Sequence, residues 1–185
     1  MAAGTWCAEV ASLLLHKPTR PSDPADWDRV TTPALPLRQH GAMKTPGFEE
    51  TRLQPLSTDA LIEARVADLI GRANQRQLWF LFLDEAQVQL PLMIPIDGLP
   101  ARPDSTIAGL VHLVAEAMAM EDARSVVAVI ERYADATLTV ADQEWARALH
   151  DTFGQQQVPL RGILLSHRRG VRWVAQDDYR FGTAD

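Results

Sequence analysis

Three carboxylates, Glu131, Asp135 and Asp142, follow one another where a run of buried-strand residues ends. The run is residues 125–131, SVVAVIE, and the second and third carboxylates lie beyond it. Carboxylate oxygens are the ligands that hard divalent cations such as magnesium prefer. The stretch could therefore hold a metal ion in a rearranged site, although carboxylates at such spacings also occur by chance where a strand leads into a helix.

A second interpretation of the same stretch needs no metal. Thr139 stands at the N-cap of a helix predicted over about residues 139–153, and its hydroxyl can accept the otherwise unpaired amide of Asp142. Asp142 can accept the Thr139 amide in return, which makes a capping box with Asp in place of Glu. A negative side chain there also suits the helix dipole. We favour this capped helix start over a catalytic loop.

No other group of residues predicts an active site. A hydrolytic zinc site needs about three protein ligands, but the histidines show neither His-x-His nor His-Glu-x-x-His spacing. Ser166 and His167 are neighbours in a predicted strand, so their side chains point to opposite faces and cannot act as nucleophile and base. Cys7 is expected to be a small packing residue. We therefore predict no catalytic residue, no bound metal and no other cofactor.

The composition is typical of a protein with one folded domain. Of the 185 residues, 46% are apolar and 23% are charged. The formal net charge of −6 disfavours binding to nucleic acid or anionic lipid over the whole surface. The basic spot at residues 167–169 is typical of a solvated hairpin tip. Because Cys7 is the sole cysteine and no apolar stretch is long enough to span a bilayer, the expected location is the cytoplasm.

Residues 1–56 are expected to form an extension to this domain. Seven of the twelve prolines lie in the first 55 residues, and residues 17–56 show no sustained apolar period, which predicts an extended linker or a surface-hugging tail. Residues 5–17 could form a short helix with one apolar side, which would be unstable without a partner surface. Tails rarely carry tryptophan without docking it. The predicted contacts to this domain, a protein partner or a second copy are Trp6, Leu13, Leu14 and Trp27.

The following chain predicts an α/β domain over residues 57–178 and a short tail over residues 179–185. Apolar residues recur at helical spacing in three segments, which begin near Ser57, near Asp104 and at Thr139. Apolar runs between and after these segments predict strands at residues 78–83, 88–96, 125–131, 161–167 and 171–175.

Two prolines place one of these strands within the fold. Pro91 and Pro95 push the strand over residues 88–96 toward a sheet edge, because proline has no amide to donate to a neighbour. The predicted order is helix, strand, strand, helix, strand, helix, strand, strand. A mixed β-sheet flanked by helices is the natural way to bury the apolar faces of such a series.

This order, together with the spacing inside residues 125–165, resembles the JAB/MPN metalloprotease fold, and within it the RadC-like bacterial branch. That family has a His-x-His-Pro at the end of the central strand, a Ser and an Asp at fixed spacing after it, and an upstream Glu. Here TVADQEWARALHDTFGQQQVPLRGILLS resembles the second half of the pattern. With Asp142 at the position of the family's Asp, its Ser falls on Thr139 and its two histidines on Val129 and Glu131.

The resemblance implies a three-layer, cytidine-deaminase-like architecture whose metal site is degenerate. The family's Pro becomes Arg132, and its upstream Glu falls near Met93. With Asp142 alone retained, the chain is expected to be a non-catalytic protein-binding or scaffolding module that pairs with a protein partner or with itself. Two alternatives stay open. One is a divergent isopeptidase-like metal hydrolase built on carboxylates around Asp142, and the other is a RadC-like nucleic-acid-associated factor, for which residues 167–169 give the only support.

Overall fold

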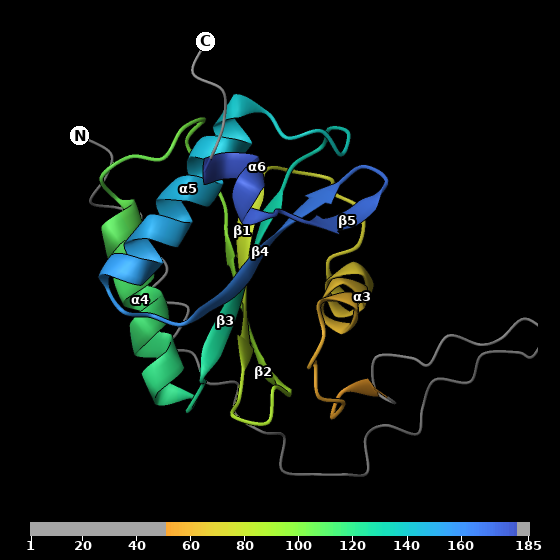
Figure 1. The fold of residues 1–185 in the computed structure, drawn as a ribbon, viewed down its shortest axis with the longest axis vertical. Coiled ribbons are helices and arrows are strands. Elements are labelled where there is room, and N and C mark those ends of the chain that lie inside the picture. The colour runs from red at the N-terminus through yellow and green to blue at the C-terminus, as the bar shows by residue number, and fades with distance from the viewer. Residues whose placement is uncertain (1–50, 181–185) are drawn as a thin grey trace, which may run out of the picture.

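The computed structural model describes residues 51–180, which form a five-stranded mixed sheet with helices on both faces (Figure 1). The predicted α/β class and the predicted order of helices and strands are confirmed, and one short helix is added at the end. In chain order the elements are α3 (Asp59–Leu69), β1 (Gln77–Leu83), β2 (Gln89–Ile96), α4 (Ile107–Met120), β3 (Ser125–Glu131), α5 (Val140–Gln155), β4 (Leu160–His167), β5 (Gly170–Trp173) and α6 (Gln176–Arg180).

The strands lie in the order β2-β1-β3-β4-β5. The pairs β1/β2, β1/β3 and β4/β5 are antiparallel, whereas β3 and β4 are parallel and are joined through α5. The strand that carries Pro91 and Pro95 is β2, and it is at the edge of the sheet as predicted. The end of β3, where the candidate residues begin, therefore lies in the middle of the sheet.

Each face of the sheet packs against its own helices (Figure 1). Helix α3 covers one face with an apolar cluster that includes Ile62 and Val66. Helices α4, α5 and α6 share a larger cluster on the other face. Phe80 belongs to that larger cluster while its neighbour Trp79 packs against the first, as alternation along a strand between two helical layers requires. Helix α5 contributes Trp145, Leu149 and Phe153, which recur every four residues, and also Ala146.

Both domain boundaries lie farther out than the sequence predicts. Leu56, assigned above to the extension, is 3% exposed and belongs to the α3-side cluster. Its amide donates a hydrogen bond to Gln87 O at 2.8 Å. At the other end, Tyr179, assigned above to the tail, is 2% exposed within α6 and packs in the larger cluster. The domain thus includes residues on both sides of the predicted range 57–178.

A close approach between β4 and β5 fixes the end of the sheet beside α3. A Cβ atom at Gly162 would lie only 2.2 Å from Cζ3 of Trp173, so the indole needs glycine beneath it. Trp173 Nε1 donates to Asp59 O at 3.0 Å, at the start of α3. Arg161 lies over the same indole, with its Cζ 5.6 Å from the ring centroid, and forms an ion pair with Asp59. These contacts tie α3 to the β4/β5 end of the sheet.

Candidate functional site

The start of α5 is a capping box, as the sequence predicts. Thr139 has extended backbone angles, φ −84° and ψ 163°, and its Oγ1 accepts the Asp142 amide at 3.2 Å. The Thr139 amide donates to Asp142 Oδ2 at 2.8 Å, and the Thr139 hydroxyl donates to the same oxygen at 2.7 Å. The local interpretation of Thr139 and Asp142 is therefore confirmed.

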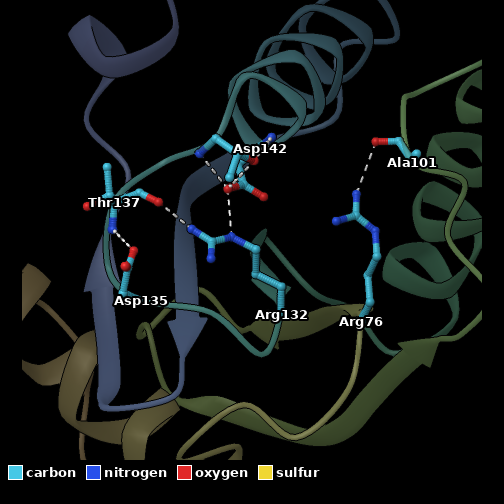
Figure 2. Close-up of polar contacts among 7 residues, drawn as sticks. Arg76, Ala101, Arg132, Asp135, Thr137 and Asp142 are labelled. Atoms are coloured by element: carbon cyan, nitrogen blue, oxygen red, sulfur yellow. Dashed lines mark hydrogen bonds and ion pairs between the residues drawn. The ribbon is translucent and has the colours of Figure 1, made fainter.

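The Asp142 carboxylate has a second partner that the sequence analysis did not predict. Arg132 Nε donates to Asp142 Oδ2 at 2.6 Å, and the exposed fractions of the two side chains are 7% and 0% (Figure 2). Arg132 Nη2 donates to the carbonyl oxygen of Thr137, while Asp135 Oδ1 accepts the Thr137 amide at 3.1 Å. One guanidinium thus joins the loop between β3 and α5 to the first turn of α5.

Two atoms of this ion pair make no hydrogen bond to any described residue. They are Arg132 Nη1 and Asp142 Oδ1, and both are shielded from solvent. Arg76 appears beside the pair in Figure 2, where it donates to Ala101 O at 3.2 Å. The pair is consequently held by one strong charge-assisted contact and leaves part of its bonding capacity uncompensated, which makes its burial costly.

Glu131 has a separate set of partners, which lie in β1 and in the segment just before it. Its Oε1 accepts the Asn74 amide at 2.9 Å, and its Oε2 accepts Gln77 Nε2 at 2.5 Å and Trp79 Nε1 at 2.8 Å. Burial raises the pKa of this carboxyl, but the hydrogen bonds, the Trp79 indole first among them, outweigh burial and hold the pKa below its ordinary value. Glu131 is therefore an ionised carboxylate stabilised by three neutral donors.

The four positions aligned with the family's two histidines, Ser and Asp do not converge on one point. Val129 is fully buried in the α3-side cluster, opposite Trp79 in the sheet. Glu131 bonds to residues 74–79, whereas Asp142 bonds to Arg132 and Thr139. The carboxylates that a rearranged metal site would share thus have different partners. Nowhere in residues 51–180 do three or more His, Cys, Asp or Glu side chains gather closely enough to hold a metal ion.

The residues present therefore do not fit a family-type metal. Zinc needs several nitrogen, sulfur or oxygen ligands around one point, and Asp142, the single ligand that the resemblance would retain, already neutralises a guanidinium. Sequence reasoning assigned Arg132 to the family's Pro position but could not identify its partner. The only signal for the ion pair was a charged residue directly after a buried strand, ten positions before a carboxylate.

The basic spot at residues 167–169 lies beside the same loop. The Arg168 amide donates to Ala134 O at 2.9 Å, and the Arg132 amide donates to Ser166 O at 3.1 Å. Burial lowers the pKa of His167, and the nearby charges of Arg132, Arg172 and Arg169 lower it further, against a smaller opposite effect of Asp135. His167 Nδ1 accepts the Arg169 amide at 3.3 Å, which also favours the neutral ring.

The predicted partner contacts Trp6, Leu13, Leu14 and Trp27 lie outside the described residues. Compared with models of known protein families and with curated protein sequences, the chain matches none. Within the part of the chain that the structure describes, every helix is too short or too polar to cross a membrane.

Proposed function

We propose that the chain is a non-catalytic, JAB/MPN-like protein-binding or scaffolding module that acts in the cytoplasm. The element order from α3 to β5 and the arrangement of helix layer, sheet and helix layer support this assignment. The observation that carries it is the contact between Arg132 and Asp142. At the place where the family resemblance implies a metal ion against this Asp, the chain supplies its own positive charge.

This contact works against metal binding at Asp142. Oδ2 accepts hydrogen bonds from the Arg132 guanidinium, the Thr139 amide and the Thr139 hydroxyl. A cation that used this oxygen would have to displace Arg132 and leave a second positive charge buried beside it, which is strongly unfavourable at low dielectric. A divergent hydrolase built on Glu131, Asp135 and Asp142 would in addition have to bring together three carboxylates that now have different partners.

Metal titration of the purified full chain tests the non-catalytic part of the proposal. Isothermal titration with Zn²⁺ and with Mg²⁺ is run on the wild type, on Asp142→Ala and on the control Glu85→Ala, which removes an exposed carboxylate from the turn between β1 and β2. We expect no stoichiometric binding that depends on Asp142, and a loss of stability in Asp142→Ala alone. One equivalent of metal that disappears in Asp142→Ala would defeat the proposal.

The binding part is tested by affinity purification of the full chain and of a chain that lacks residues 1–50. We expect a companion protein, or a second copy of the chain, to be recovered. Its recovery should be saturable and should survive 0.5 M salt, a concentration on the order of that which screens charge pairs on the surface. Recovery of nucleic acid in its place, lost when Arg168 and Arg169 are both changed to Gln, would favour the nucleic-acid alternative.

A further inference from the structure

A groove on the α3 side of the sheet lies next to the point where the described chain begins. Its volume is about 690 Å³, a size typical of ligand and side-chain pockets. Among the described residues, two polar side chains, Arg52 and Gln89, and five apolar ones line it; the apolar ones are Leu53, Leu69, Leu90, Pro91 and Met93. Leu53 is 74% exposed, so its side chain is open to contact from an occupant of the groove.

A buried arginine, Arg65, connects segments that contribute residues to the groove. Arg65 of α3 donates from Nη1 to Gln89 Oε1 at 3.1 Å and from Nη2 to Thr51 O at 2.5 Å. These two bonds join α3, the start of β2 and the segment 51–53, each of which contributes a side chain to the groove. A preformed groove costs less to fill than one that must first be ordered.

The edge of β2 disfavours an occupant that would extend the sheet. Pro91 and Pro95 have no amide hydrogen, so a strand added beside β2 would lose hydrogen bonds at both positions. An occupant of this groove should therefore dock through apolar side chains, as a short amphipathic helix does when it lies in a hydrophobic groove.

The chain itself supplies such a segment. Residues 6–15 carry Trp6, Val10, Leu13 and Leu14 at helical spacing, and a helix of this length is unstable without a surface to cover. The tether between this segment and the domain ends at the groove, because Arg52 and Leu53 line it. Residues 16–50 join the two, and a chain of that length reaches on the order of 100 Å when fully extended, so the segment can reach the groove, where its effective concentration is high.

We propose that residues 6–15 dock in this groove of the same chain, with Trp6, Leu13 and Leu14 in contact with Leu53, Leu69 and Met93. This inference does not depend on the proposed function, because the groove lies away from Arg132 and Asp142 and neither residue lines it. A partner that recruits the N-terminal segment would then have to compete with the chain's own groove.

Paramagnetic relaxation in the full chain tests the contact. The sole cysteine is replaced in Cys7→Ser, and a nitroxide is attached at Ser12→Cys, which lies opposite the apolar side of the predicted helix. Methionine methyl groups report the position: Met93 lines the groove, whereas Met118 and Met120 lie on α4 across the sheet. We expect Met93 to lose most of its signal, to recover when the nitroxide is reduced, and to be affected far more than Met118 or Met120.

A matched pair of variants locates the contact. Leu53→Glu should restore the Met93 signal, while Met120→Glu, at a methionine that is also exposed, should leave the loss unchanged. An unchanged chemical shift of the Met118 methyl group in both variants verifies that the fold is retained. An unaffected Met93 in the parent, or a loss that persists in Leu53→Glu, would overturn the proposal. The proposal would also be overturned if the Met93 signal were lost only in a mixture of two kinds of chain, one that carries the nitroxide and one that carries the observed methyl groups. A second copy of the chain would then be the occupant of the groove.

Discussion

Arg132 and Asp142 form a buried ion pair in which Nε lies 2.6 Å from Oδ2, and the pair joins the end of β3 to the first turn of α5. The same carboxylate completes the capping box with Thr139, so one side chain serves the helix start and the loop together. Because the guanidinium is almost wholly out of solvent, neither partner can be removed without leaving the other as a buried charge.

Loss of Arg132 should therefore destabilise the domain strongly. We expect Arg132→Met to lower the free energy of unfolding by about 3–5 kcal/mol, because Asp142 would stay buried without its cation. Urea denaturation followed by circular dichroism measures this. The double variant Arg132→Met/Asp142→Asn, in which the amide oxygen can still cap the helix, should recover part of the loss. If the single variant lost less than about 1 kcal/mol, the typical net value of one hydrogen bond, the pair would not hold the loop.

Glu131 should make the domain sensitive to acid. Its pKa lies below the ordinary value in the folded protein because the bonds from Trp79, Asn74 and Gln77 outweigh the effect of burial. The folded state thus binds fewer protons, so the stability that Glu131 contributes is present above the unfolded pKa of about 4.3 and is lost as the pH falls through the folded pKa. The stability difference between wild type and Glu131→Gln should shrink as urea melts are moved from pH 7 to pH 3.

The control for this prediction is Glu85→Gln, which changes an exposed glutamate in the turn between β1 and β2. Its difference from the wild type should stay small at every pH, because the side chain is in water in both states. If the free energy of unfolding of Glu131→Gln changed with pH as that of the wild type does, the hydrogen-bond donors to Glu131 would not favour its charged form.

His167 should weaken the domain at mildly acidic pH. Burial, and then Arg132, Arg172 and Arg169, lower its pKa in the folded state. The unfolded chain therefore binds more protons, so the contribution of His167 is full above the unfolded pKa of about 6.5 and falls as the pH drops through the window below it. In His167→Gln, thermal unfolding should depend less on pH between 7 and 5, on the order of the range where His titrates.

A matched control for His167 is His112→Gln, on the exposed side of α4, where the imidazole faces Glu116. This variant removes an exposed imidazole in place of a buried one. If thermal unfolding became equally less dependent on pH in the two variants, the cause would be the general loss of positive charge and not the burial of His167.

Gly162 should tolerate no side chain. A Cβ there would meet Cζ3 of Trp173 at 2.2 Å, and the indole is held by its bond to Asp59 O and by Arg161. We expect Gly162→Ala to cost about 1–3 kcal/mol, as overpacking does. Gly154→Ala in α5 is the control, because no atom lies within 4 Å of a Cβ at that position. It should be neutral or stabilising by up to about 1 kcal/mol, the helical preference of Ala over Gly. Similar stability of the two variants would contradict the clash.

Most of the fold could be predicted because local patterns determined it. Continuous apolar runs gave the strands, helical periods gave α3, α4 and α5, and Pro91 and Pro95 assigned β2 to the sheet edge. Helix α6 was missed because QDDYR has no apolar period, and Tyr179 is buried only through its contact with the larger cluster. Leu56 was missed for a similar reason, since one leucine in a proline-rich stretch gives no repeating signal.

The site was predictable only where its contacts are close in sequence. The bonds between Thr139 and Asp142 follow from a spacing of three residues, and they were predicted. The donors to Glu131 depend on the cross-strand register that places Gln77 opposite Glu131, and no local pattern reveals a register. The ion pair of Arg132 needs the path of the loop through Thr137, which only the folded chain defines.

The parallel pairing of β3 with β4 has a consequence for biosynthesis. Strand β3, SVVAVIE, can pair with β1 as soon as it leaves the ribosome, but its other edge stays open until α5 and β4 have been made. An apolar, β-branched edge of this kind is prone to aggregate while it is unpaired. Nascent chains that stall within α5 should therefore be the ones that most need a chaperone.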